Sequence, residues 1–198
     1  MKLREKNLKI LKNNHVYSEE MEHDACGVGV IVSTEGKKSR TIVEYGIEAL
    51  KAVWHRGAVD ADGKTGDGAG IHLEIPKDFF IEKIDVTGHE HDNSEICVGM
   101  IFLPRNDYSA QETCKTIVES ELTKNNFSIY GWRQVPVNPK ILGEKAFQTM
   151  PEIMQVLFKS NDKNLLDKNL ERKIYETRKK IENKAFQLSL NNFYTVSY

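Results

Sequence analysis

Apolar residues recur along this chain at two different spacings, one typical of strands and the other of helices, and together they predict a mixture of both. Alternation of apolar with polar or small residues is the period of a strand, because successive side chains point to opposite faces. In residues 27–33, Val28, Val30 and Val32 share one face, and glycines on the other face would let another element approach closely. Clean alternation also predicts a strand over residues 71–76, and a more buried apolar run predicts one over 95–104. Further strands are predicted over residues 127–137, 151–159 and 191–198.

Apolar residues at helical spacing predict helices between these strands. A helix is expected over residues 41–58, with Gly57 as its C-terminal stop. Ser109 and Glu112 have the spacing of a capping box, which predicts the start of a second helix. A short helix is predicted over residues 139–150, and one long charged helix or a pair of helices over 164–188. Mixed elements of this kind are typical of an α/β or α+β domain.

Residues 59–70 contain four glycines and three aspartates in twelve positions, which predicts a loop. A phosphate-binding loop is excluded, because Ala58 stands where its first glycine belongs and the loop leads into a predicted strand. A calcium loop is excluded as well, because Ile71 replaces the bidentate glutamate. His89 and His91 are the remaining metal candidates, but two histidines in a polar stretch are usually solvated. We therefore predict no metal site.

Composition narrows the function classes. A chain of 198 residues is long enough for one domain with a sizeable core. Its 28 lysines and arginines balance 29 aspartates and glutamates, so no basic excess points to nucleic acid. The apolar runs are much shorter than the ~20 residues that span a membrane. Residues 1–25 are polar and lack the apolar core of a secretory signal, so we expect a leader and a cytoplasmic protein.

Three cysteines, Cys26, Cys97 and Cys114, form no CxxC pair and indicate neither a zinc site nor a disulfide framework. The last two lie in predicted elements, where cysteine packs as a small apolar residue. Cys26 has two possible interpretations. It is either another small buried residue, or a nucleophile freed by cleavage of the Ala25–Cys26 bond. In the second case its own α-amine, with an unperturbed pKa of roughly 7.7–8.0, is available as a base.

The order of several motifs resembles one known family. "DACGVGVIV", "GIEALKAVWHRGAVDADGKTGDGAGIHLEIPKDFF", "VGMIFLPRN", "YGWRQVPV" and "FYTVSY" follow one another here. This series is similar to the N-terminal class II glutamine amidotransferase domain of glutamate synthase large subunits. The resemblance runs from about Asp24 to the last residue. It implies an α+β fold, the four-layer αββα sandwich of the N-terminal-nucleophile hydrolases, truncated at its C-terminal end.

The resemblance also implies site residues and a domain division. Residues 1–25 would be a propeptide, and residues 26–198 the N-terminal part of the amidotransferase domain. Cys26 would attack the side-chain amide of glutamine and form a thioester. Arg56 would lie beside the nucleophile, unless it is a surface cation at a helix end. Asp67 and Gly68 belong to a family loop near the active site, unless that loop is only a tight turn.

Cofactors and partners are expected on the same ground. In the complete family enzyme, ammonia travels to a site with FMN and an iron–sulfur cluster, where 2-oxoglutarate is aminated and reduced. No cofactor is expected in this chain. The expected partners are glutamine, the remainder of the large subunit and a small electron-donating subunit, with no nucleic acid and no membrane. The family's Asn-Gly oxyanion dipeptide does not occur in these residues. We therefore expect a fragment with little activity of its own, or a non-catalytic remnant with a structural role.

Overall fold

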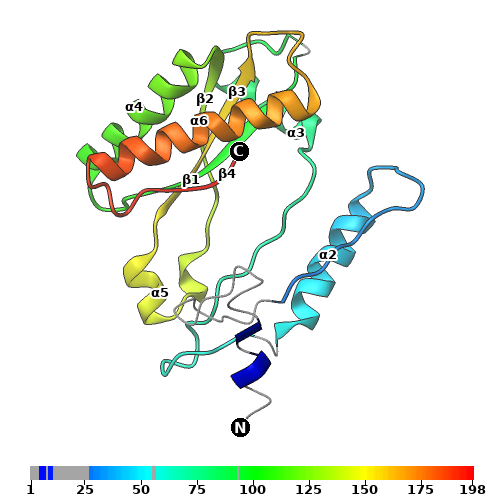
Figure 1. Cartoon of the computed structure of the whole chain (residues 1–198), viewed down its shortest axis with the longest axis vertical. Coiled ribbons are helices and arrows are strands. Elements are labelled where there is room, and N and C mark those ends of the chain that lie inside the picture. The colour runs from blue at the N-terminus through cyan, green and yellow to red at the C-terminus, as the bar shows by residue number, and fades with distance from the viewer. Residues whose placement is uncertain (1–4, 8, 11–26, 55–56, 93) are drawn as a thin grey trace. The chain divides into compact units, whose positions relative to one another are not determined.

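The computed structural model describes residues 5–7, 9–10, 27–54, 57–92 and 94–198 (Figure 1). The chain divides into two compact units. The smaller comprises the described residues of Met1–Val59 and Gly66–Ile71. The larger comprises Asp60–Thr65 and the described residues of His72–Tyr198.

The larger unit is built on a four-stranded antiparallel sheet with the order β2-β3-β1-β4. Its strands are β1 (Cys97–Leu103), β2 (Phe127–Gln134), β3 (Glu152–Ser160) and β4 (Tyr194–Ser197). The central pair runs in continuous register from Cys97 opposite Phe158 to Leu103 opposite Glu152. These four strands confirm the predictions made for their regions, and β2 ends before Pro136 as expected.

One face of the sheet carries the main core. Burial alternates along β1, so that Cys97, Ile101 and Leu103 are buried on this face. They pack against apolar residues of α4 (Tyr108–Lys124) and α6 (Asp167–Gln187), which lie side by side across the sheet (Figure 1). α6 is one continuous helix, which settles the choice between a single helix and a pair.

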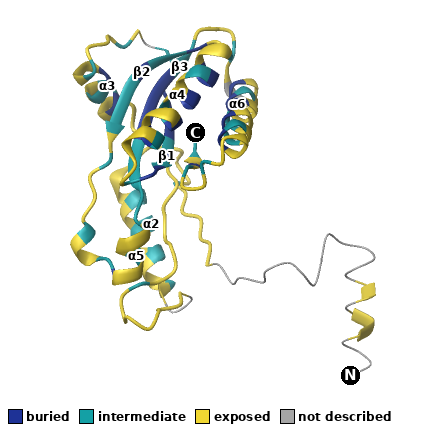
Figure 2. Cartoon of the chain, turned by 90° about the vertical axis from the view of Figure 1, so that its left-hand side faces the viewer, coloured by how far each residue is buried: buried dark blue, intermediate teal, exposed yellow. Residues whose placement is uncertain are grey.

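The opposite face is covered by α3 (Lys77–Val86), and Figure 2 shows α3 and α6 on opposite sides of the sheet. Phe80 and Ile84 of α3 form a second cluster with Ile96, Tyr130 and Leu157. The hydrophobic pattern did not predict α3. Further along the same face, apolar side chains are only half-buried, namely Met100, Phe102 and Ile153.

The connection between β2 and β3 contains a short 3₁₀ helix, η2 (Pro139–Ile141), and the helix α5 (Glu144–Thr149). This agrees with the short helix predicted over residues 139–150. The start of α4 differs from its prediction. Asp107, rather than Ser109, caps this helix, since its carboxylate accepts a 2.9 Å hydrogen bond from the Ala110 amide.

The smaller unit contains one long helix, α2 (Arg40–Ala52), capped by the Ser39 hydroxyl, which accepts from the Thr41 amide. The predicted stop at Gly57 was wrong, because the helix ends at Ala52 with Val53 as its C-cap. No residue of α2 is buried.

Two strand predictions were wrong. Residues 27–33 and 71–76 have no regular secondary structure, and Val28, Val30 and Val32 are 88%, 80% and 70% exposed. Alternation places side chains on two faces, but a strand forms only where a neighbour accepts and donates its backbone hydrogen bonds. No such neighbour pairs with either segment within the part of the chain that is described.

No helix among the described residues is both long enough and apolar enough to cross a membrane. α6 is the longest, with 21 residues, and its sequence is strongly charged. Charged side chains of α6 bind the neighbouring elements β4 and α4. Arg178 donates to the Thr195 carbonyl of β4 at 2.9 Å, and Lys184 pairs with Glu121 of α4.

Candidate active site

Two of the predicted site residues, Cys26 and Arg56, lie outside the described residues, as does most of the 1–25 leader. Asp67 and Gly68 are described. The site can therefore be built from the glycine-rich loop, whose residues follow Arg56 closely along the chain. This loop has two parts. Its base, residues 58–59 and 66–68, belongs to the smaller unit, and its turn, residues 60–65, belongs to the larger unit.

At the base, Asp67 pairs with Ala58 through both backbone and side chain. The Asp67 carboxylate accepts from the Ala58 amide at 2.8 Å, and the Asp67 amide donates to the Ala58 carbonyl at 3.3 Å. Val59 and Gly66 form an isolated antiparallel bridge beside this pair. The carboxylate therefore holds the backbone of the segment that follows Gly57.

The glycines of the base differ in what the structure requires of them. A Cβ on Gly66 would lie 3.0 Å from the Ala58 carbonyl oxygen, so the close approach of the two segments favours glycine there. A Cβ on Gly68 would meet nothing within 4 Å, and Gly68 is exposed. Among the described residues, none packs where a side chain of residue 68 would lie.

The turn, residues Asp60–Thr65, is organised around the carboxylate of Asp62. This carboxylate accepts hydrogen bonds from the Thr65 hydroxyl at 2.5 Å, the Thr65 amide at 2.7 Å and the Lys64 amide at 2.9 Å. The Thr65 hydroxyl makes the largest contribution to lowering the pKa of Asp62 below its usual range. The Asp60 amide donates to the Thr65 carbonyl, and Gly63 takes a positive φ of 69°. Asp62 thus serves as the acceptor that fixes the conformation of the turn.

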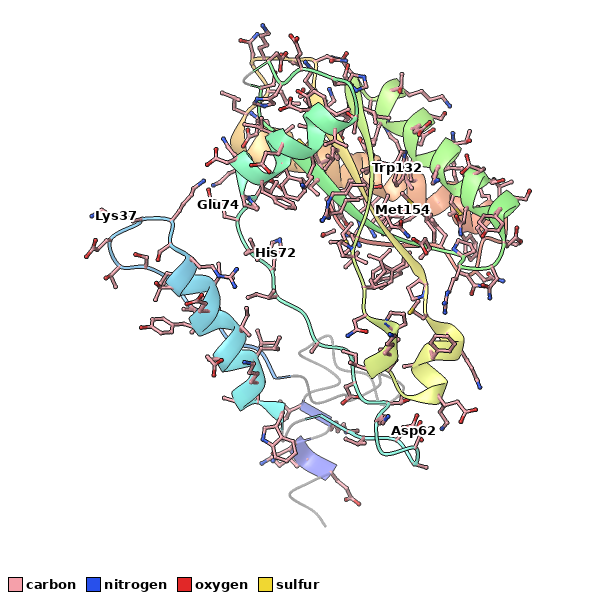
Figure 3. All side chains as sticks on the ribbon, turned by 180° about the vertical axis from the view of Figure 1, so that it is seen from behind. Lys37, Asp62, His72, Glu74, Trp132 and Met154 are labelled. Carbon is pink, nitrogen blue, oxygen red and sulfur yellow. The ribbon has the colours of Figure 1, made fainter. Side chains whose placement is uncertain are left out.

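The same turn contacts α5, and Figure 3 marks Asp62 at this place. Lys145 donates to both carboxylate oxygens of Asp60, at 2.8 and 2.7 Å. The Ala146 amide donates to the Thr65 hydroxyl at 3.4 Å. Sequence analysis missed Thr65, Gly143 and Lys145, because more than 75 residues separate the turn from α5 and no local pattern links them.

Cys97 and Cys114 are buried and free, which confirms that they pack in the core. Burial is the main cause that raises the pKa of Cys97 to about 12 and that of Cys114 to about 11. Both thiols are therefore protonated near neutral pH and poor nucleophiles. Neither thiol is therefore a candidate for a reactive cysteine.

The two histidines considered as metal ligands have other contacts. His89 Nδ1 lies 3.1 Å from the Thr87 hydroxyl, and His91 Nε2 lies 2.9 Å from the Ser94 carbonyl. Both rings pack against Tyr130. Among the residues that the structure describes, no group of three or more histidine, cysteine or acidic side chains could hold a metal ion.

A cavity of about 320 Å³ lies near these histidines, where Asp92 and Lys159 form an ion pair at 2.5 Å. The hydrogen bond from Lys159 is the main cause that lowers the pKa of Asp92, while burial raises the pKa of Tyr130 to about 12. The cavity is lined by Asp92 and by polar and aliphatic residues between 94 and 170, and neither of the two described site residues, Asp67 and Gly68, lines it.

Comparison with known proteins identifies the family of the domain that contains the glycine-rich loop. The family "Glutamine amidotransferases class-II" matches residues 26–198, which is most of the chain and includes all four predicted site residues. The chain belongs to the class-II glutamine amidotransferases. The match begins at Cys26, the residue that the sequence marked as the candidate nucleophile.

Individual relatives of this amidotransferase domain are much longer proteins. The chain is 50% identical over 191 residues to the glutamate synthase [NADPH] large chain of Azospirillum brasilense, covering 96% of this chain and 12% of that protein. It is 38% identical over 175 residues to the ferredoxin-dependent glutamate synthase of Pyropia yezoensis, covering 88% and 11%. A chloroplastic/mitochondrial ferredoxin-dependent enzyme of Arabidopsis thaliana is 40% identical over 162 residues, covering 81% and 10%. The chain thus spans about a tenth of the length of these relatives.

Proposed function

We propose that this chain forms the glutamine-hydrolysing part of a glutamate synthase, with Cys26 as its nucleophile. One observation carries the proposal: the amidotransferase match begins at Cys26 and extends through the whole glycine-rich loop. The printed names of the relatives support the parent enzyme, since those reported above are all glutamate synthases. The ammonia released would serve the formation of glutamate from 2-oxoglutarate.

The proposed chemistry is acyl transfer through a thioester. The Cys26 thiolate attacks the side-chain carbonyl carbon of glutamine, and the carbonyl oxygen becomes an oxyanion. The intermediate collapses, the C–N bond breaks, and ammonia leaves with the proton that came from the thiol. Water then attacks the thioester, which releases glutamate and restores the thiol.

Proton transfer requires a base beside Cys26. Removal of residues 1–25 by hydrolysis of the Ala25–Cys26 bond would free the α-amine of Cys26. An unperturbed α-amine has a pKa of roughly 7.7–8.0, so it accepts and returns a proton near neutral pH. We infer that residues 1–25 are a propeptide and that the mature domain begins at Cys26.

Three further residues support the nucleophile in this proposal. Arg56 supplies positive charge beside the site. The Asp67 carboxylate and amide hold the Ala58 backbone two residues after Arg56, which would fix the direction in which the chain leaves that arginine. Gly68 is exposed and has open space where a side chain would be, which suits close approach of a substrate to the backbone.

We also propose the four-layer αββα sandwich as the complete fold. The larger unit supplies one sheet with α4 and α6 on its outer face. Its other face leaves Met100, Phe102 and Ile153 only half-buried, and a second sheet packed there would bury them. Exposed apolar surface of this kind usually marks a contact with another layer or partner.

The redox chemistry of the parent enzyme is assigned to segments beyond this chain. Iron–sulfur clusters are usually held by four cysteine thiolates, whereas this chain has three cysteines, two of them buried and protonated in the core. These residues do not fit the cluster. We therefore place FMN and the cluster in the remainder of the large subunit, with a small electron-donating subunit as a further partner. Free cysteines are typical of a reducing compartment, which supports a cytoplasmic location.

The decisive experiment is a Cys26→Ala substitution in the full-length protein. Glutamine-dependent glutamate formation should be lost, while formation from added ammonia should continue because it bypasses the thiol. A diazo-ketone analogue of glutamine should label Cys26 in the unaltered protein, with Cys97 and Cys114 as internal controls in the same peptide map. Glutamine hydrolysis that survives Cys26→Ala would refute the assignment. Absence of labelling and hydrolysis in the unaltered protein would favour the non-catalytic remnant.

A further inference from the structure

We propose that Asp62 and Thr65 are positioning residues for glutamine hydrolysis, because they fasten the turn that leads into the Gly66–Gly70 loop onto helix α5. We call this arrangement the α5 clasp, consisting of Asp60, Asp62, Thr65, Gly143 and Lys145, together with the Ala146 amide. The inference rests on the proposed function, since it concerns the same site. It goes further by assigning a role to residues outside the loop itself.

The first line of support is the way in which α5 begins. Its N-cap residue is Gly143, which has no side chain to accept a hydrogen bond from the first turn of the helix. The Thr65 hydroxyl takes this place, since it accepts from the Ala146 amide at 3.4 Å while donating to Asp62 at 2.5 Å. A side chain 81 positions earlier in the sequence thus supplies the missing cap.

The second line of support is that Gly143 leaves room for the turn. Gly143 is buried, and a Cβ there would collide with the Thr65 hydroxyl oxygen and with the Asp62 carboxylate. The fit is therefore close enough to exclude even a methyl group. A loop that only rested near α5 would not require glycine at this position.

The third line of support is electrostatic. Lys145 pairs with both oxygens of Asp60 across 85 positions of sequence. The Asp62 carboxylate lies beside Gly143, and the Lys145 backbone amide is among the hydrogen-bond donors that lower its pKa. An aspartate is ionised at neutral pH in any case, and the hydrogen bonds of Asp62 move its pKa further below the usual value of 3.8. The clasp therefore stays assembled under the conditions in which glutamine hydrolysis would take place.

The functional consequence follows from the residues that come next. Thr65 is bonded to Gly66, and three of the five residues of the Gly66–Gly70 loop are glycines. Glycine segments lose more conformational freedom on ordering than any other, so such a loop needs a fixed anchor to hold one conformation. Small displacements of substrate-positioning groups reduce rates strongly, because reacting atoms must approach in the correct geometry. Release of the clasp should therefore slow glutamine hydrolysis without any change in the nucleophile.

The test compares Thr65→Val with Thr65→Ser in the full-length protein. Valine keeps the shape of threonine but removes the hydroxyl, whereas serine keeps the hydroxyl. We expect Thr65→Val to lower kcat/KM for glutamine by about 10- to 100-fold, mainly through kcat, while Thr65→Ser stays within about twofold. Gly143→Ala should act in the same direction as Thr65→Val. Thr113→Val is the matched control, because that hydroxyl bonds only to a carbonyl within the exposed face of α4.

Two further readouts separate positioning from general damage. Glutamate formation from added ammonia should be unchanged in every variant. Hydrogen exchange of residues 63–68 should accelerate in Thr65→Val but not in Thr65→Ser. Equal activities of the valine and serine variants, or equal losses with glutamine and with ammonia, would overturn the positioning role. Failure of the unaltered protein to hydrolyse glutamine would instead refute the proposed function, and it is seen before any variant is compared.

Discussion

At the scale of single residues, burial separates the core thiols from a reactive one. Cys97 and Cys114 share one apolar cluster with Ile101 and Val118, and desolvation disfavours their thiolate forms. The chemistry proposed for Cys26 requires instead an accessible thiol with a low pKa. The assignment of the nucleophile therefore implies a reactivity difference among the three cysteines that can be measured.

We predict that Cys97 and Cys114 resist alkylation by iodoacetamide at pH 8 in the folded chain. Their raised pKa values reduce the thiolate fraction about 10³-fold and 10²-fold relative to the unperturbed value of 9.0. Because the folded state favours the neutral thiols, their contribution to stability is complete below pH 9.0 and is lost as the pH rises toward 12. Peptide mapping before and after unfolding in urea measures the difference. Equal labelling of Cys114 in both states would contradict it.

At the scale of elements, the sequence predicted the strands and helices whose own residue pattern determines them. It failed where an element depends on contacts with residues far away in the sequence. The strand β1 was predicted because its apolar run matches the burial that alternates along it, and β3 because its apolar run matches four consecutive buried residues. Residues 27–33 alternate just as clearly, yet they form no strand, because pairing depends on a neighbour that the local pattern does not contain. The helix α3 was missed for a related reason, since Phe80 and Ile84 face a cluster assembled from β2 and β3.

One acidic side chain, Glu182, takes part in the attachment of β4 to α6, and it gives a prediction for acid stability. Burial alone would raise the pKa of Glu182, but hydrogen bonds from Lys179, Thr195 and Arg178 outweigh it and lower the pKa to about 2. A lowered carboxylate pKa stabilises the fold above the unperturbed value of 4.5. That contribution is lost as the pH falls from 4.5 toward 2.

Glu182→Gln should therefore lower the free energy of unfolding by about 1–3 kcal/mol at pH 7, because hydrogen bonds to a charged, half-buried carboxylate are lost. It should also flatten the pH dependence of stability below pH 4.5. Glu176→Gln is the matched control, since its side chain is 52% exposed and pairs only along the helix with Arg172. Urea unfolding at pH 7 and pH 3 measures both variants. Equal effects of the two substitutions would show that Glu182 does not fasten β4.

At the scale of the whole molecule, short sequence motifs predicted the family. Only the three-dimensional contacts showed that the turn before the Gly66–Gly70 loop is attached to α5. "HRGA" and "TGDGAG" lie in one stretch of sequence, so their order was sufficient to identify the glutamine amidotransferase domain. The α5 clasp could not be predicted in this way. Thr65 and Gly143 meet only because the chain between them folds into α3, α4 and the β1–β3 sheet, and a glycine without context does not reveal that it makes room for a threonine.

The last prediction concerns how stability is distributed between the two units of this 198-residue chain. α2 has 13 residues and none is buried, whereas α4 carries Val118 and Leu122 completely or almost completely buried. Isolated helices of this length are marginal in water, so packing determines which of the two persists. We expect the amides of α2 to exchange with deuterated solvent about two orders of magnitude or more faster than those of α4, because local opening is governed by buried contacts. Hydrogen-exchange mass spectrometry on the chain compares the two helices directly. If α2 proved as protected as α4, its apolar side chains, among them Tyr45 at 58% exposure, would have to be buried in solution.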